Sequence, residues 1–420
     1  MTESIYTFGT SEHQQFLADQ TRELLEFGKR FPWPGGGASY LRDDGSPWPG
    51  QGLEAYETGR FAHAYALGSF LSIPSKDEAR RLCVASLLGF TTGALHDRRH
   101  GGWYTSVLAS GTPQEGKACY AHAFVLLGAS SALLAHVPGA KALLDDALDI
   151  YERHFWDAAE HMPFDTWDTS FETLDDYRGV NASMHSVEAF LAVSDATDDP
   201  LYRNRAGAII NRVLNFARTM HWRIPEHFDS QWTPAPEYNA DRKQDQFKPY
   251  GSTPGHGLEW ARLIAQWALN AYAHHEISLT QRDEYVRSCE HLFERAVADG
   301  WNADGQPGFI YTVGWDGSPV IHDRMHWTLA EGINTTAVLY RLTGKEQYAE
   351  FYATLWRYAD QYVIDHKQGS WHHQLDANNR PIGTVWPGKP DIYHALQATL
   401  IPTFDTPELG TSIATVLSRR

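Results

Sequence analysis

The chain has 420 residues, 42% of them hydrophobic, which is enough to build a large buried core. Its formal net charge is −17 and its Lys and Arg residues form no basic stripe, so nucleic acids and anionic membrane surfaces are excluded as expected partners. No run of about 18 apolar residues occurs, so no membrane-spanning helix is predicted.

The cysteines and the N-terminal sequence indicate the compartment. Cys83, Cys119 and Cys289 are too few and too widely spaced for a disulfide framework or a zinc site, so reduced thiols are expected. The first residues, MTESIYTFGTSEHQQF, contain neither the basic start nor the apolar run of a secretory signal. We therefore expect a cytoplasmic protein. Because no linker-like stretch interrupts the chain, residues 1–420 are expected to form a single domain.

Amphipathic helical periodicity recurs six times along the chain. In one such segment, Ala79, Leu82, Cys83 and Ser86 follow the i, i+3, i+4, i+7 spacing, with charged residues between them. This pattern predicts a helix with one buried and one solvated face. The six segments begin near Ser11, Lys76, Lys141, Leu201, Gln281 and Glu346.

Six further segments, which alternate with the first six, are apolar or small on nearly every side and predict helices that are buried all round. They are Glu54–Phe70, Cys119–Ala135, Met184–Val193, His256–Asn270, Trp327–Leu342 and Ile392–Pro402. Six repeats in 420 residues give a unit of roughly 70 residues, which is typical of a solenoid or a closed toroid. Because six pairs can close on themselves, we predict an all-α fold, an (α/α)6 barrel of twelve helices.

The connections after the predicted outer helices are dense in Gly, Trp and His. Residues 302–320 and 368–382 alternate around Asp-Gly and Asn-Asn turns, which predicts short β-hairpins. Such hairpins would line one mouth of the barrel.

Polar side chains gather at the starts of the buried helices. Because these starts converge at one end of a toroid, the side chains are expected to face a shared cavity, and buried charges there must be paired or functional. A single His at a helix start is more often a packing or capping residue, but six helices that each contribute such residues predict one site. The residues are Tyr56, Arg60, Tyr120, His122, Asn181, His185, Glu188, His256, Glu259, His326, Trp327, Glu331, Tyr393 and His394.

Histidine suits this site for proton transfer, because its pKa lies near neutrality and two facing rings can act as general base and general acid. The chain has neither a Gly-rich phosphate loop nor a Ser nucleophile elbow, so nucleotide cofactors and acyl-enzyme chemistry are not predicted. The 15 Trp residues are compatible with stacking on the faces of sugars as well as with core packing.

Three alternatives remain open at this point. His185 with Glu188, and His256 with Glu259, have a spacing that could hold a metal, although Tyr, Trp and Arg are as frequent nearby as ligands, so we expect no metal. An inverting glycoside hydrolase needs two opposed carboxyls about 6.5–9.5 Å apart. The third alternative is a helical repeat protein that binds sugars without catalysis.

Several runs resemble the N-acylglucosamine 2-epimerase superfamily across almost the whole chain. Within it, the sequence is most similar to the branch of aldose–ketose isomerases that act on mannose, which is related to the sulfoquinovose isomerases. The runs are GGWY (101–104), NASMHSVEAF (181–190), PEHFDSQW (225–232), GSTPGHGLEWARL (251–263) and VWPGKPDIYHAL (385–396).

This resemblance implies His256 and His394 as the acid/base pair, a free monosaccharide as substrate, no cofactor and a cis-enediol intermediate. The implied reaction is mannose–fructose isomerisation, extending to lyxose and xylulose, with 2-epimerisation of mannose, cellobiose or an N-acylglucosamine as the alternative. His326 stands where a basic residue is common in this branch, which favours a neutral hexose over a sulfonated one. The resemblance implies these substrate-binding residues: Arg60, Tyr120, Asn181, His185, Glu259 and Trp327, with Glu226, Phe247, Trp386 and Asp391.

Overall fold

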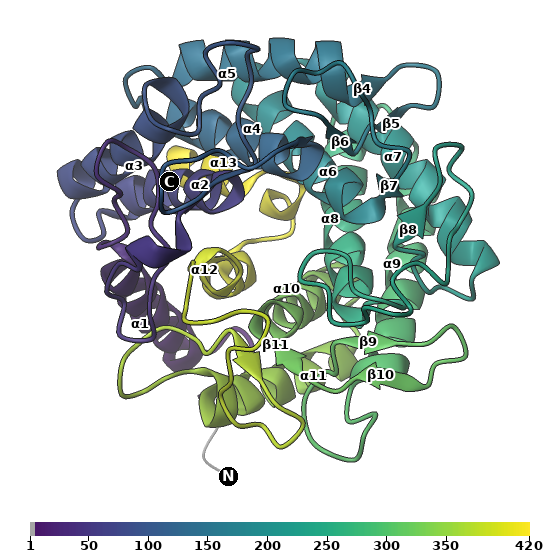
Figure 1. Ribbon diagram of the computed structural model, residues 1–420. Helices are drawn as coiled ribbons and strands as arrows, with labels where there is room; N and C mark the ends of the chain where they lie inside the picture. Colours follow the sequence, from purple (N-terminus) through teal and green to yellow (C-terminus); the bar gives the residue numbers. More distant parts are fainter. Residues whose placement is uncertain (1–4) are drawn as a thin grey trace.

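Two concentric rings of helices make up the computed structural model, which describes residues 5–420 (Figure 1). The inner ring consists of α2 (Ala55–Leu71), α4 (Cys119–Leu134), α6 (Val180–Thr197), α8 (Pro254–Ala273), α10 (His326–Thr343) and α12 (Tyr393–Leu400). The outer ring consists of α1 (Ser11–Gly28), α3 (Lys76–Thr91), α5 (Ala140–Ile150), α7 (Pro200–Thr219), α9 (Leu279–Gly300) and α11 (Glu346–Tyr358). The short α12 contacts both α10 and α2 and so closes the ring. The predicted helical barrel is confirmed.

The two rings begin their helices in different ways. Thr10, Ser75, Asp199 and Ser278 each accept a backbone N–H with their side chains and so cap an outer helix. Among the described residues, no N-cap side chain does this for an inner helix. The positive ends of the six inner helix dipoles are directed at one end of the barrel, where Asp391, just before α12, accepts the backbone N–H of Tyr393.

Short antiparallel strand pairs hold the inner helix starts at that end. Four of them join the residues just before an inner helix to the segment after the next outer helix, a pairing the sequence did not reveal. They are β1 (Leu53–Glu54) with β2 (Ser106–Val107), β3 (Lys117–Ala118) with β6 (Thr166–Trp167), β7 (Arg178–Gly179) with β8 (His227–Phe228), and β11 (Arg324–Met325) with β12 (Gln374–Leu375).

Local hairpins also occur. β9 (Thr312–Val313) pairs with β10 (Pro319–Ile321) around the predicted Asp-Gly turn, and β4 (Trp156–Asp157) pairs with β5 (Met162–Pro163). An antiparallel bridge between Leu375 and Pro381 closes the turn predicted within 368–382.

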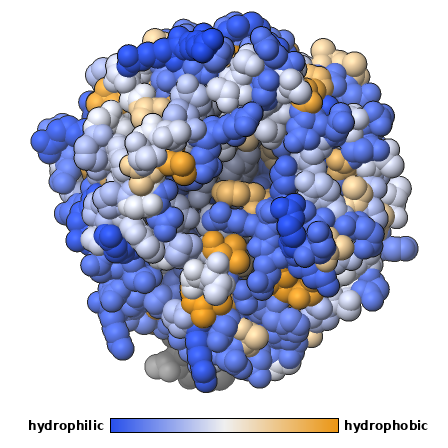
Figure 2. All heavy atoms as spheres, viewed as in Figure 1, coloured by the Kyte–Doolittle hydropathy of each residue, from blue (hydrophilic) through white to orange (hydrophobic). Residues whose placement is uncertain are grey.

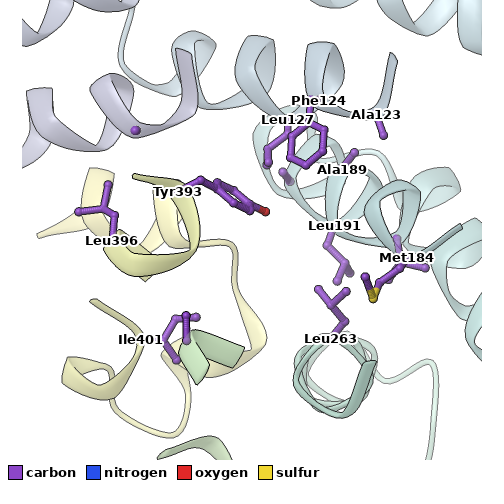
Figure 3. Close-up of a cluster of buried hydrophobic side chains, with 14 of the residues drawn as sticks. Ala123, Phe124, Leu127, Met184, Ala189, Leu191, Leu263, Tyr393, Leu396 and Ile401 are labelled. Carbon is purple, nitrogen blue, oxygen red and sulfur yellow. The ribbon is translucent and has the colours of Figure 1, made fainter. Parts of the chain in front are cut away.

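The core fills the space between the inner helices with apolar side chains from neighbouring repeats. Figure 3 shows Phe124 and Leu127 of α4 near Ala189 of α6, and Leu191 of α6 near Leu263 of α8. The Tyr393 ring of α12 meets Phe124 edge-on, with the ring centroids 5.6 Å apart. Because α12 also contacts α1 and α2, the chain's first and last repeats are packed into one core, as ring closure requires.

A thirteenth helix, α13 (Ile413–Arg419), lies outside the predicted repeat and contacts α2, α4 and α6. It follows two 3-10 turns, Ile401–Thr403 and Glu408–Gly410. Its first residue lines a buried cavity with His63 and Leu127, which lie further along the inner helices than the residues at their starts. The C-terminal segment therefore closes the barrel at the end opposite the inner helix starts. Within residues 5–420, no helix is long and apolar enough to cross a membrane.

Candidate active site

A pocket of about 600 Å³, a volume that includes space open to solvent, lies where the inner helices begin. Figure 2 shows a hollow near the centre of this face, surrounded mostly by hydrophilic atoms. The pocket walls include every residue that the resemblance implies for catalysis or substrate binding except Glu226: Arg60, Tyr120, Asn181, His185, Phe247, His256, Glu259, Trp327, Trp386, Asp391 and His394. Of the other residues expected to face the cavity from the inner helix starts, His326 lines the pocket, whereas Tyr56, His122, Glu188, Glu331 and Tyr393 are not among its lining residues. Other lining residues are Gln246, Pro249, Tyr311, His326, His373 and Pro390.

Glu226 lies directly behind His256. The Nδ1 of His256 is 2.8 Å from Glu226 Oε2. Because a carboxylate oxygen accepts, the ring proton sits on Nδ1, and Nε2 keeps a lone pair on the ring that lines the pocket. The backbone N–H of Val180 donates to the Glu226 carbonyl, which ties this carboxylate to the start of α6.

His394 is held in the same manner by a different carboxylate. Its Nδ1 is 2.9 Å from Glu331 Oε1, while its Nε2 lies 3.4 Å from the Nη2 of Arg60, which can only donate. Burial lowers the pKa of His394, and Arg60 lowers it further, although Glu331 acts in the opposite direction. The ring is therefore neutral at neutral pH and its Nε2 can act as a base.

The Trp327 indole lies between the two imidazoles. Its ring centroid is 5.0 Å from that of His256 and 6.0 Å from that of His394, with interplanar angles of 31° and 38°. An indole face of this kind suits the C–H face of a sugar. A sugar on Trp327 would have a histidine base within reach on both sides.

Arg60 is fixed by an ion pair and by aromatic rings. Its Nη1 donates to Asp391 Oδ2 at 2.7 Å and its Nη2 donates to the Tyr120 hydroxyl at 3.1 Å. The guanidinium lies over the Phe124 and Tyr393 rings at 4.7 and 4.9 Å. Although burial opposes ionisation, Arg60 holds the pKa of Asp391 below its usual range. The pocket thus contains a fixed cation whose charge is largely matched.

Three buried carboxylates converge on one cation, Arg262. Its Nε donates to Glu331 at 2.8 Å, and its Nη2 lies 3.6 Å from both Glu188 and Glu259. Although burial opposes it, Arg262 lowers the pKa of Glu331, whereas burial and the nearby Glu331 raise the pKa of Glu259 well above its usual range. These carboxyls are gathered around one guanidinium, so they do not form the opposed pair of an inverting hydrolase.

Metal binding is disfavoured by the partners that the possible ligands already have. Three His/Asp/Glu groups have ligand atoms within 4.8 Å of one another: His326, His373 and Asp391; His185, Glu188 and Glu259; and Glu259, Glu331 and His394. Asp391 is paired with Arg60, and Arg262 lies beside the other two groups. A cation placed in any of them would face a guanidinium.

Two loops meet over the pocket. Phe247, in the loop of residues 236–250, packs edge-on against Trp386 with centroids 5.5 Å apart. Gln246 Nε2 donates to the Val385 carbonyl at 3.2 Å, and Phe247 also contacts the Tyr56 and Tyr120 rings. We call Gln246, Phe247, Val385 and Trp386 the roof of the pocket.

Sequence reasoning placed His122 with the site, but its ring packs on Phe155, and its Nε2 accepts the backbone N–H of Trp103. It serves the packing of α4. Conversely, His373 and Tyr311 line the pocket but were not singled out, because they lie in loop and strand segments rather than at a buried helix start. The sequence signal that could have identified these two residues is their position within the Gly-rich and Trp-rich connections.

Comparisons with known proteins identify relatives over nearly the full chain. A D-mannose isomerase from Thermobifida fusca is 40% identical over 409 residues, which cover 96% of this chain and 98% of that protein. A D-mannose isomerase from Pseudomonas cannabina pv. alisalensis is 37% identical over 407 residues, 96% of this chain and 95% of that protein. A crystal structure of a D-mannose isomerase superposes with a TM-score of 0.82 at 27% identity, over 92% of this chain and 97% of the other.

The helical barrel and its histidine site, together with these relatives, define the chain as an enzyme of the sugar isomerase and epimerase class. The family model described as N-acylglucosamine 2-epimerase (GlcNAc 2-epimerase) matches residues 36–398, and the chain belongs to this family.

The pairing of Glu226 with His256 generates a first prediction. Glu226→Ala leaves the His256 Nδ1 without its acceptor, so the ring loses its fixed orientation, and we expect kcat to fall by up to about 10²-fold. Glu226→Gln keeps an acceptor oxygen, so its kcat should fall less than that of Glu226→Ala. Steady-state kinetics of both variants, with circular dichroism to confirm folding, measure this, and an Ala variant with the wild-type kcat would contradict it.

Proposed function

We propose that this enzyme interconverts D-mannose and D-fructose by moving a proton between C2 and C1. The observation that carries the proposal is the pair of histidines, His256 and His394, each held at Nδ1 by a carboxylate and each with its ring beside Trp327. Two relatives named D-mannose isomerase, at 40% and 37% identity over nearly the full chain, support mannose as the substrate.

The reaction follows from acid–base chemistry on the open-chain aldose. One histidine takes the proton from C2, the C–H electron pair forms the C1–C2 double bond, and O1 takes up a proton to give the cis-enediol. The proton is then delivered to C1 while the hydroxyl at C2 loses its own proton and becomes the ketone. Arg60 and the inner helix dipoles stabilise negative charge that develops on the oxygens.

Substrate binding in this proposal falls to the remaining predicted residues that line the pocket. Asn181 and His185 come from α6, and Glu259 comes from α8. Burial and the neighbouring Glu331 raise the pKa of Glu259 well above its usual range, which favours the protonated carboxyl, the form that can donate to a sugar hydroxyl. Phe247 and Trp386 close over the sugar, which limits the access of water.

We also propose that the chain acts without a metal, as a single domain, in the cytoplasm. The guanidinium beside each possible ligand group supports the first point. One hydrophobic cluster with members from all six helix pairs supports the second. Three buried cysteine thiols are compatible with the third.

The fate of the C2 proton tests the reaction. Incubation with D-mannose in deuterated water should give D-fructose labelled at C1, because the histidine exchanges the proton it takes from C2 with the solvent before a deuteron is delivered to C1. Proton and carbon NMR of the early products measures this. D-glucose labelled at C2 as the main early product would instead establish 2-epimerisation, and conversion of cellobiose or N-acetylglucosamine with inert mannose would assign a different substrate.

Removal of either histidine should nearly abolish turnover. His256→Ala and His394→Ala each remove a group that handles a proton in every cycle, so we expect kcat to fall by about 10²- to 10⁴-fold. His185→Ala should mainly raise KM. Steady-state kinetics with circular dichroism spectra distinguish these effects, and a histidine variant with a near-normal rate would exclude that residue from catalysis.

Chelation tests the absence of a metal requirement. Enzyme dialysed against excess EDTA should keep its full kcat, because the histidines and the buried guanidinium groups supply the acid–base and electrostatic functions. Metal content measured by mass spectrometry serves as the control for complete removal. Turnover that disappears and returns with one particular divalent ion would overturn this point.

A further inference from the structure

One corner of the pocket has no role in the proton transfer described above. His326, the first residue of α10, stacks on His373, which precedes β12, with ring centroids 3.7 Å apart and an interplanar angle of 26°. Asp391 forms the third side of this corner. All three side chains are buried, and all three line the pocket.

The backbone fixes the protons of both rings. His326 Nδ1 lies 3.4 Å from the His373 carbonyl oxygen, and His373 Nε2 lies 3.1 Å from the Asp391 carbonyl oxygen. A carbonyl oxygen only accepts, so these two nitrogens carry the protons. The other two nitrogens, His326 Nε2 and His373 Nδ1, therefore present lone pairs.

Neither ring becomes charged near neutral pH. Burial, followed by the neighbouring His373, lowers the pKa of His326 well below its usual value. Burial also lowers the pKa of His373, to about 4. Asp391 is ionised, and its two oxygens accept from Arg60 and from the backbone N–H of Tyr393. The corner therefore consists of hydrogen-bond acceptors.

His326 Nε2 is the atom in this corner that lacks a partner. Among the described residues, no group donates to it, although it is fully buried. A buried acceptor without a donor is costly and calls for a ligand that supplies one. A sugar hydroxyl supplies such a donor, whereas a phosphate, sulfonate or carboxylate group offers only acceptors and would bring a negative charge towards Asp391.

We propose that the acceptor corner formed by His326, His373 and Asp391 recognises one hydroxyl of the substrate as a hydrogen-bond donor, with His326 Nε2 as the acceptor. The corner thereby selects sugars that are neutral at that carbon over sugars with an anionic substituent there. This inference rests on the proposed function, because it takes a monosaccharide as the occupant of the pocket.

Fluorinated substrates combined with a His326 variant test the recognition. Fluorine replaces a hydroxyl at nearly the same size but cannot donate. D-mannose and its 3-, 4- and 6-deoxyfluoro analogues are compared in wild type and in His326→Phe. One analogue should lose about tenfold in kcat/KM with wild type, which is the size of a single hydrogen bond. In His326→Phe, mannose should fall to the level of that analogue, so that their ratio approaches one.

His122→Phe is a matched control. His122 is also buried, its Nδ1 also bonds a backbone carbonyl, that of Ala118, and its Nε2 already accepts from Trp103 outside the pocket. This variant should keep the wild-type ratio between mannose and the sensitive analogue. His326→Gln, which offers an amide oxygen as acceptor, should restore part of the ratio. It also keeps the test valid if His326→Phe fails to fold by circular dichroism.

The charge selection is tested with mannose phosphorylated at the sensitive carbon. We expect wild type to turn it over at least about tenfold less well than mannose. Equal turnover of the phosphate ester would overturn the selection. Two results would show that the corner contributes only to packing. One is equal turnover of mannose and all the fluorinated sugars by wild type, and the other is an unchanged ratio between mannose and the sensitive analogue in both His326 variants.

Failure of the proposed function is recognised separately. If wild type does not isomerise mannose at all, the function is wrong. Calorimetric binding of the same four sugars to His256→Ala, with and without His326→Phe, then provides the same comparison without turnover. If His256→Ala with His326→Phe binds the four sugars with the same hydroxyl preference as His256→Ala alone, the inference about the corner itself is overturned.

Discussion

The buried guanidinium of Arg262 is the interaction on which the site depends. It lies on α8 and reaches Glu331 of α10 at 2.8 Å and Glu188 of α6 at 3.6 Å. Glu188 in turn accepts from the Tyr393 hydroxyl and, at 3.1 Å, from Gln397, both on α12. Four inner helices are thus tied together through one cation. Breaking a buried pair of this kind by removing one partner costs about 3–5 kcal/mol, because the remaining charges stay buried.

The two histidines receive their orientation from different parts of this architecture. Glu331, which holds His394, is itself held by Arg262, so this base is anchored in the centre of the barrel. Glu226, which holds His256, directly precedes β8, and β8 pairs with the strand that leads into α6. The strand pairs at the barrel mouth therefore position the carboxylate that holds His256 as well as closing the connections. In both arrangements the carboxylate binds Nδ1, so that the lone pair of the neutral ring lies on Nε2, as a proton-transfer base requires.

The helices could be predicted from the sequence because each spans several turns of a clear period. The predicted outer starts at Ser11, Lys76 and Glu346 coincide with the observed ones. The strand pairs before the inner helices were not predicted, since two residues are too short to show alternation. The helix α13 was missed because it falls outside the repeat, although it is needed to close the barrel.

From the residue pattern alone, the site was predictable where polar residues interrupt apolar helices, whereas the loop residues Phe247, Trp386 and Asp391 were predicted from the family resemblance. Arg60 and His185 stood out for this reason, and the structure places both on the pocket. Arg262 gives the same signal two turns into an apolar helix, but it points to carboxylates rather than into the pocket, and Glu188 and Glu331, two of its partners, come from two other helices. Such a network depends on which helices are neighbours, which periodicity alone does not specify. The position of His373 depends on the loop conformation, so it could not be predicted from the sequence either.

The roof of the pocket bears on the choice between isomerisation and epimerisation. Both reactions begin with removal of the proton from C2, but a 2-epimerase must return a proton to C2 on the opposite face, which requires the enediol to turn between the histidines. Trp327 lies close to both imidazoles, and Phe247 and Trp386 meet over the same space, with Phe247 also held by Tyr120. Aromatic rings on these sides restrict rotation of the intermediate. Delivery of the proton to C1 needs no such rotation, since C1 adjoins C2 and the enediol is planar across both carbons. Aromatic rings placed around the intermediate in this way therefore favour the ketose as product.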